Sequence, residues 1–477
     1  MSFDSVTFWL FLPVALADWR LLPFNAAKSA MVGLSLLYYG WWNPWFTVPI
    51  VFSSVVDYWA GNKIHAAGER KHKRRWLGVS LVANLGLLGV FKYTPFVVGN
   101  LEQLLDRPAE ASWDFSNWLI PIGISFYTFQ TLSYSIDIYR GQLEPAKRFR
   151  DFLLYVSFFP QLAAGPIVRA RTLLPQLQRR MRVSAAKIQA GVYHVVLGMF
   201  LKVVVADNLA PVVDVCFNKK FVVTLTPSHT WLAAFYFTVQ VFADFAGYSC
   251  IAIGLAYLMG LKFPANFRWP FISRSFSEFW RRWHISLSQW LRDYVYISMG
   301  GNRRGRLLTL CFLMATMTLG GLWHGASWTF ITWGIVQGLA LCVEHLFRRR
   351  SPIVGSATRP TGALDLLARF VQIGFVFTFV VATFVLCRAS DFELVQMMWS
   401  KMFIAPFHEP LGLGAFADAR HLVLALPVFL LHVGQLVHEW YGVRPSRTTQ
   451  AYLIAVLFFL LLVVERNAPS QFFYFQF

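Results

Sequence analysis

The sequence predicts an all-α, polytopic integral membrane protein, and three observations carry this prediction. Of the 477 residues, 56% are apolar and only 14% are charged, and the mean hydropathy is positive, at +0.49. Apolar runs that can cross a bilayer as helices recur along the chain. Basic residues gather between these runs, as they do in the cytoplasmic loops of membrane proteins. A soluble globular chain does not combine these features.

The charges of the loops order the predicted spans, which number eleven or twelve. Met1–Leu22 is expected to be a retained first span, because Asp4 stands where a signal peptide is basic and no small-residue cleavage site follows. Segment 63–75 is strongly basic and the loop after the fourth span is acidic, which places the N-terminus outside. Later spans are predicted at about 188–209, 230–260, 367–388, 421–440 and 451–464, with two more within 307–347.

One apolar segment is too broken to be a straight span. Residues 152–168 contain two prolines and a glycine, so we expect a re-entrant or interfacial segment there. The chain has no internal repeat and no long Pro/Gly/Ser linker, so 1–477 is predicted to form a single membrane domain. Its short, interrupted spans suit helices that line a cavity.

The net charge of +19 would suggest a nucleic-acid partner in a soluble chain. Here positively charged cytoplasmic loops account for it, so we expect membrane lipid and no nucleic acid as partner. No two cysteines have metal-ligand or redox spacing. We therefore expect no structural zinc or other metal and no disulfide framework. The cysteines are Cys216, Cys250, Cys311, Cys342 and Cys387.

The most informative stretch is Leu307–Phe347, a long apolar run with His324 near its middle. Its length corresponds to about 60 Å of helix, roughly twice the hydrocarbon thickness of a bilayer, so it must fold back on itself. Arginines flank both ends, which places both on the cytoplasmic side. The turn is predicted at Gly320, Gly321 and Gly325, with His324 on it.

His324 has two interpretations on the residues alone. A lone histidine on an apolar face is often a hydrogen-bonded core residue. A charged side chain within the membrane, however, costs about 3 kcal/mol or more, so ionisable residues held there are commonly functional. We expect a neutral imidazole at this position.

A second informative segment is Ser275–Met299. Ser275 and Glu278 have capping-box spacing, which predicts a helix start. Aromatic and apolar residues then recur at steps of four and three, so we predict one amphipathic helix on the cytoplasmic side, with His284 beside its apolar face. Arg281 and Arg282 either anchor this helix at the interface or bind the phosphates of a nucleotide-bearing donor.

Polar residues also interrupt the preceding apolar run, Gln240–Phe271. Asp244 lies inside this run, Tyr248 follows one turn later, and Asn266 lies in a proline-bounded loop. An acid at membrane depth is either paired or functional. The sequence does not name a partner for Asp244.

Four motifs and the C-terminal end carry a resemblance to a known family. They are FADFAGYS at 242–249, FPANFRWPF at 263–271, SFSEFWRRWHISLSQWLRDYVYISMGGNR at 275–303, GGLWHGASWTFITWG at 320–334 and the terminal FFYFQF. Together they resemble the membrane-bound O-acyltransferases, and within them the bacterial branch typified by the membrane subunit of alginate O-acetylation. The D-alanyl transfer protein of teichoic acids is a more distant relative. The resemblance covers the central third closely and the remainder by topology.

The resemblance implies a ring of about eleven transmembrane helices around a thinned central pore, with re-entrant and amphipathic helices. It places the two active-site histidines of the family at His284 and His324. In one departure, Cys250 stands where the branch usually has an acidic residue after GYS, and Ala246 stands where serine is common. Cys250 therefore inherits no role.

The implied reaction is acyl transfer. An acyl thioester is already activated, so the enzyme has to position an acceptor hydroxyl, remove its proton and stabilise the oxyanion. We assign His324 as general base, His284 to thioester hydrogen bonding or proton relay, and Arg281 and Arg282 to the donor, with Asp244, Tyr248 and Asn266 as supporting residues.

The resemblance further implies acetyl-CoA as donor substrate, with no tightly bound cofactor, and an exported polysaccharide such as alginate or cellulose as final acceptor. It implies an extracytoplasmic partner protein and the bacterial inner membrane as location. Two alternatives remain on the residues: a transporter or exporter component for an acylated intermediate with no chemistry of its own, and a scaffold that recruits soluble acetyltransferases.

Overall fold

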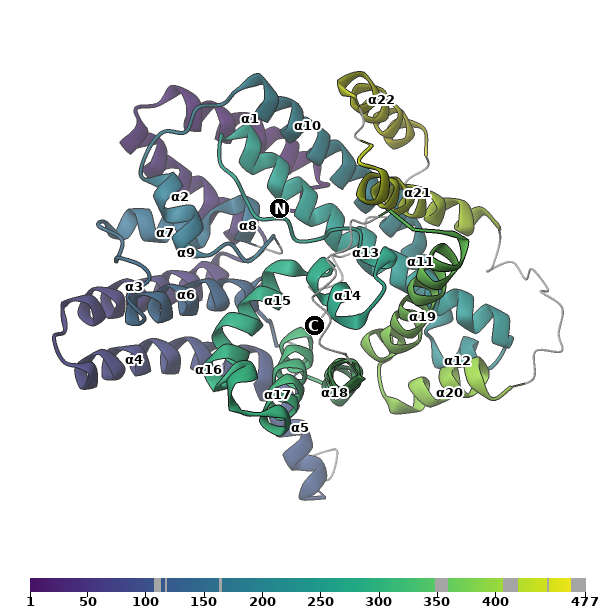
Figure 1. Ribbon diagram of the computed structural model, residues 1–477. Helices are drawn as coiled ribbons and strands as arrows, with labels where there is room; N and C mark the ends of the chain where they lie inside the picture. Colours follow the sequence, from purple (N-terminus) through teal and green to yellow (C-terminus); the bar gives the residue numbers. More distant parts are fainter. Residues whose placement is uncertain are drawn as a thin grey trace. The chain divides into compact units, whose positions relative to one another are not determined.

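The computed structural model describes residues 1–106, 113–115, 118–162, 165–347, 359–405, 419–443 and 446–464. Within these ranges the chain forms helices and no strand (Figure 1). It divides into two compact units, one of residues 1–195 with 251–264 and the other of 196–250 with 265–477. The all-α prediction is confirmed. The single domain and the ring around a thinned pore stay predictions, as does the terminal FFYFQF motif, which lies outside the described residues.

The first unit is built from short helices. They are α1 (Val6–Leu21), α2 (Phe24–Gly40), α3 (Thr47–Ala66), α4 (Arg70–Leu88), α5 (Thr94–Leu104), α6 (Ile124–Tyr139), α7 (Phe149–Ser157), α8 (Phe159–Leu162), α9 (Ala170–Leu177) and the start of α10 (Ala185–Met199). The segment predicted to be too broken for a straight span contains α7 and α8, which are separated at Phe158. It contains no straight span among its described residues.

The second unit contains the predicted site. Its helices are the end of α10, α11 (Asp207–Cys216), α12 (Lys219–Val222), α13 (Pro227–Leu258, through Cys250), α14 (Phe276–Arg282), α15 (Ile285–Leu291), α16 (Ile297–Met299), α17 (Arg306–His324), α18 (Trp328–Phe347), α19 (Ala363–Arg388), α20 (Phe392–Phe403), α21 (Ala419–Tyr441) and α22 (Arg447–Val463). Segments of π-helix at 200–206 and 292–296 continue α10 and α15.

In the part of the chain that the structure describes, seven segments are long and apolar enough to cross a membrane. They are Arg70–Leu104, Ala185–Cys216, Pro227–Leu258, Arg306–His324, Trp328–Phe347, Ala363–Arg388 and His421–Tyr441, and the shorter Thr448–Val463 is also apolar. The protein is thus a multi-pass membrane protein. The predicted count of eleven stays a prediction.

The long apolar run folds back on itself as α17 and α18, which lie side by side in Figure 1. Glycines let the two backbones approach. A Cβ on Gly321 would lie 2.3 Å from the carbonyl oxygen of Phe330, and one on Gly334 would lie 2.5 Å from that of Met317. The predicted hairpin is confirmed, but the position of its turn is corrected. Gly320 and Gly321 lie within α17, where Gly321 allows close packing against α18, and of the three glycines only Gly325 lies in the turn.

Candidate functional site

His324 is the last residue of α17, at the closed end of the hairpin. Gly325 caps the helix and donates its N–H to the carbonyl of Gly321 at 3.3 Å. A Cβ on Gly325 would lie 2.1 Å from the ring of Phe330, so only glycine fits beneath that ring. The hairpin therefore fixes the backbone of His324 and buries its imidazole, which is 4% exposed.

His284 lies at a break in the helix that the sequence predicted to run from Ser275 to Met299. The start is as predicted, since Ser275 Oγ accepts the N–H of Glu278 at 3.2 Å. The prediction of one continuous helix was wrong, because α14 ends at Arg282 and α15 begins at Ile285. Between them, His284 adopts the left-handed backbone conformation at φ 39° and ψ 55°. Such a backbone costs a non-glycine residue about 1–3 kcal/mol and persists only where the surroundings hold it.

Asn266 holds the residues that follow His284. Its Oδ1 accepts the hydroxyl and the N–H of Ser286 at 2.8 and 3.3 Å, and its backbone carbonyl accepts the N–H of Ile285 at 2.8 Å. Its Nδ2 donates to Ser249 Oγ at 2.9 Å. Asn266 thus ties the turn at His284 to the FADFAGYS motif of α13, and all four side chains concerned are buried.

The two histidines predicted from the sequence lie together. Their ring centroids are 5.9 Å apart, with the planes at 60°. His284 packs edge-on against Phe245 at 4.5 Å, and His324 packs edge-on against Trp333 at 5.2 Å. Burial, and secondarily the neighbouring His324, hold the pKa of His284 well below that of an ordinary imidazole, so this ring is neutral at pH 7.

A cavity of about 470 Å³ reaches His324. Buried His324 and Trp333 line it together with the exposed Arg268, Arg281 and Arg292. The indole N–H groups of Trp280 and Trp333 are buried and meet no acceptor within the described ranges. The cavity therefore combines one imidazole, two indole N–H donors and three cationic groups, of which Arg292 is paired with the carboxylate of Asp293 at 2.7 Å.

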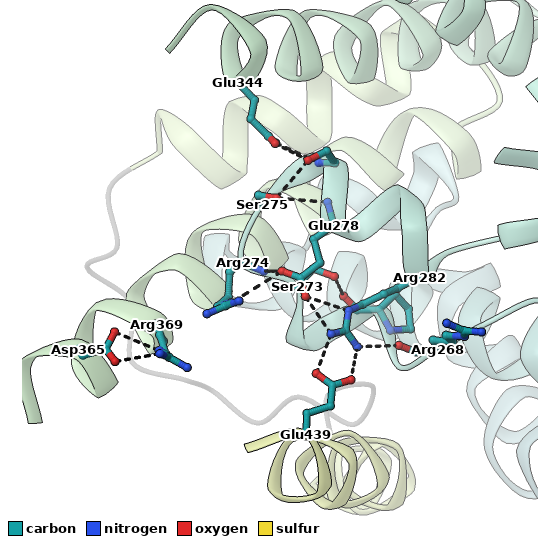
Figure 2. Close-up of polar contacts among 12 residues, drawn as sticks. Arg268, Ser273, Arg274, Ser275, Glu278, Arg282, Glu344, Asp365, Arg369 and Glu439 are labelled. Carbon is teal, nitrogen blue, oxygen red and sulfur yellow. Dashed lines mark hydrogen bonds and ion pairs between the residues drawn. The ribbon is translucent and has the colours of Figure 1, made fainter. Parts of the chain in front are cut away.

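Arg281 and Arg282, predicted together as donor-binding residues, have different surroundings. Figure 2 shows Arg282 between two carboxylates: its NH1 and NH2 donate to Glu439 at 2.8 and 2.7 Å, and its Nε and NH2 donate to Glu278 at 3.0 and 2.8 Å. Arg282 also donates to the carbonyl of Arg268 at 3.1 Å. These contacts tie α14 to α21, whereas Arg281 is exposed and lines the cavity.

Asp244 has a buried partner that the sequence did not reveal. Lys202 lies 2.9 Å from Asp244 and 2.8 Å from Asp207, and all three are buried. Lys202 belongs to the π-helical segment 200–206, and such segments often occur at functional sites. Tyr248, one turn after Asp244 on α13, is buried as well.

Sequence reasoning missed Arg268, Arg292 and Lys202. Arg268 and Arg292 stand inside motifs quoted for the resemblance, FPANFRWPF and the RWHISLSQWLRD segment, so motif membership was an available signal. Lys202 lies in an apolar run, and nothing in the sequence around it indicated a functional site. Among the described residues, no group of three or more His, Cys, Asp or Glu side chains is placed to hold a metal ion.

Comparison with known proteins identifies the family. The model of MBOAT, the membrane-bound O-acyltransferase family, matches residues 97–387. This chain belongs to that family. It is therefore a membrane-bound O-acyltransferase, and this finding displaces the transporter and scaffold alternatives.

Three relatives show what proteins similar to this chain are called. A probable alginate O-acetylase of Azotobacter vinelandii is 40% identical over 447 residues, covering 93% of this chain and 85% of the relative. A peptidoglycan O-acetyltransferase of Helicobacter pylori is 35% identical over 71% of this chain and 69% of its own length. A teichoic acid D-alanyltransferase of Streptococcus thermophilus is 30% identical over 51% and 61%.

Proposed function

We propose that this enzyme transfers an acetyl group from cytoplasmic acetyl-CoA toward hydroxyls of an exported polysaccharide, in the bacterial inner membrane. Alginate is the first candidate polymer and cellulose the second. The observation that carries the proposal is the pair of buried imidazoles 5.9 Å apart, one of which lines an open cavity. The names of the relatives, which include alginate and peptidoglycan O-acetyltransferases, support a polysaccharide acceptor.

His324 acts as general base in the proposed reaction. It takes the proton of the acceptor hydroxyl while the oxygen attacks the thioester carbonyl, and the C–S bond then breaks. The CoA sulfur leaves and receives the proton from His324. General-base assistance of this kind contributes about 10²- to 10⁴-fold.

His284 supports the same step from the other side of the pair. As a neutral ring, it hydrogen-bonds the thioester or relays the proton through one bridging oxygen. The indole N–H of Trp333, in the same cavity, is a candidate donor to the oxyanion, because a preorganised donor at that position stabilises developing charge.

The cavity suits a CoA thioester in size and charge. Its volume of about 470 Å³ lies within the range of about 300–1,000 Å³ typical of small-molecule sites. Apolar side chains, including Leu287, Met317 and Leu341, suit the pantetheine arm. Arg281, with Arg268 and Arg292, is proposed to contact the phosphates, whereas Arg282 is held by its carboxylates and stabilises the scaffold.

The final acceptor lies outside the membrane in this proposal, so an extracytoplasmic partner protein receives the acetyl group and completes the transfer. The resemblance to the alginate O-acetylation branch supports this arrangement. Asp244 and Tyr248 are proposed to support α13 behind the histidines. Asn266 is proposed to position His284.

The test uses membranes of an alginate-producing bacterium from which its own membrane O-acetylase has been deleted, so that any further components are present. With labelled acetyl-CoA, the full chain should release free CoA thiol and label the polymer. His324→Ala should abolish both, whereas His345→Ala, a histidine in the last turn of α18, should leave both unchanged. Full activity of the His324→Ala protein, or acetyl transfer without thiol release, would contradict the proposal.

A further inference from the structure

A second, much smaller cavity touches the same imidazole. It offers about 20 Å³ of space for the centre of a water-sized group. His324 and Trp333 line both this cavity and the large one. The remaining lining residues are nearly all apolar: Phe237 and Val241 of α13, Trp283, Phe330, and Phe384 and Cys387 of α19.

The size of the small cavity suits one group of about one heavy atom. About 10–15 Å³ of such space holds one water molecule, so 20 Å³ accommodates a single group of roughly that size and no chain. A water molecule there would have few polar partners, because the walls are aromatic and aliphatic, and a stable buried water needs two to four. A methyl group matches both the size and the apolar lining.

The walls of the small cavity are packed firmly enough to enforce this limit. The ring of Phe384 lies 5.2 Å from that of Trp283 and 6.1 Å from that of Trp333. Trp283 also stacks on Phe279 at 5.5 Å, with the planes at 17°. Close-packed rings of this kind accept an added methylene only by leaving their preferred positions.

We propose that the small cavity beside His324 receives the methyl group of the acyl donor and restricts this enzyme to two-carbon acyl groups. This inference rests on the proposed acyltransferase site and adds the acyl chain length to it. The relatives include both acetyl- and D-alanyltransferases, so the size of the acyl group differs among them. An acetyl carbonyl held next to His324 would extend its methyl into this cavity, while the CoA moiety occupies the large one.

The first experiment compares acetyl-, propionyl- and butyryl-CoA as donors, by release of free CoA thiol in the same alginate-producing membranes. A pocket that excludes one added methylene discriminates by about 10- to 200-fold in kcat/KM. We therefore expect acetyl-CoA to be preferred to propionyl-CoA by a factor in this range, and to butyryl-CoA by at least as much. Similar use of all three donors by the wild-type chain would overturn the inference while leaving the proposed acyl transfer intact.

The second experiment enlarges the small cavity. Val241→Ala removes two methyl groups from its wall and should narrow the acetyl-to-propionyl preference by about 10-fold. Val239→Ala is the matched control, because Val239 is buried on the same helix but lines neither cavity. Its preference should match that of the wild type.

The outcomes separate the two proposals. Equal changes in preference for Val241→Ala and Val239→Ala would overturn the assignment of the small cavity, even if the wild type prefers acetyl-CoA. Thiol release from none of the donors would instead refute the proposed function, and the chain-length inference with it. Should Val241→Ala fail to accumulate in the membrane, Val241→Leu fills the same space and should lower kcat/KM for acetyl-CoA about 10-fold, and unchanged use of acetyl-CoA by it would count against the inference.

Discussion

Asn266→Ala tests whether the loop after α13 positions His284. The substitution removes the Oδ1 that accepts both the hydroxyl and the N–H of Ser286, and the Nδ2 that donates to Ser249. These bonds join buried side chains, so their loss weakens a buried polar network. We expect a loss of about 1–3 kcal/mol in the free energy of unfolding.

The effect of Asn266→Ala on turnover should exceed this loss of stability. His284 has a left-handed backbone that needs support, and a shift of about 1 Å in a reacting group costs about 10²-fold in rate. We expect kcat for CoA release to fall about 10²-fold, with the KM for acetyl-CoA changed less than threefold, because the cavity arginines are untouched.

Two controls distinguish positioning from general destabilisation. Asn266→Asp keeps an oxygen for Ser286 and accepts from the Ser249 hydroxyl, so it should recover most of the lost kcat. Asn208→Ala removes an amide that donates to the carbonyls of Val203 and Val204 in the same unit, and should lower the melting temperature without a selective loss of kcat. A kcat for Asn266→Ala within threefold of the wild type would refute the positioning role.

Three further predictions concern other parts of the second unit. Because the pKa of His284 is lowered, the unfolded chain binds a proton there below about pH 6.5 while the folded chain does not. The free energy of unfolding should therefore fall from pH 7 to pH 5 by up to about 1.4 kcal/mol per pH unit. The slope of melting temperature against pH should be smaller for His284→Gln, and an unchanged slope would contradict a neutral buried ring. Arg281→Ala should raise the KM for acetyl-CoA about 10-fold without lowering the melting temperature. Arg282→Ala should mainly lower the melting temperature, because it leaves Glu278 and Glu439 without their guanidinium. The reverse pattern would refute a donor-binding role for Arg281 and a structural role for Arg282. Lys202→Met should destabilise the fold by about 3–5 kcal/mol, because Asp207 and Asp244 lose their shared ammonium, and the loss of folded protein on heating measures this effect. The control Lys220→Met, at the exposed start of α12, should cost less than about 1 kcal/mol. Equal losses for the two variants would contradict a buried triad.

The sequence predicted the helical class and the hairpin around His324 because both follow from local patterns. Apolar length gives the spans, and flanking arginines with an internal glycine require the run at 307–347 to turn back. The break at His284 could not be predicted in this way. Apolar residues continue at helical spacing from Phe276 through Trp283 to Tyr294, so periodicity alone favours an unbroken helix, and the bonds from Asn266 that stabilise the break come from another segment.

Contacts between distant segments explain the other differences. Lys202 and Asp244 belong to different helices, so no spacing in the sequence relates them. Arg281 and Arg282 are adjacent in sequence, but neighbouring residues on a helix point about 100° apart. One of them therefore faces the carboxylates of Glu278 and Glu439 and the other the cavity, a distinction that depends on where α21 packs.

The neutral state of His284 constrains the order of proton transfers in the proposed mechanism. Two imidazolium rings 5.9 Å apart would repel each other strongly in a buried site, where the effective dielectric constant is low. If His324 accepts the acceptor's proton, His284 must not bind a second proton while His324 is charged. The lowered pKa of His284 enforces this condition, because the ring does not compete for a second proton at neutral pH. A protein in which His284 is replaced by a permanently charged side chain, as in His284→Arg, should therefore lose turnover even where the cavity still binds acetyl-CoA.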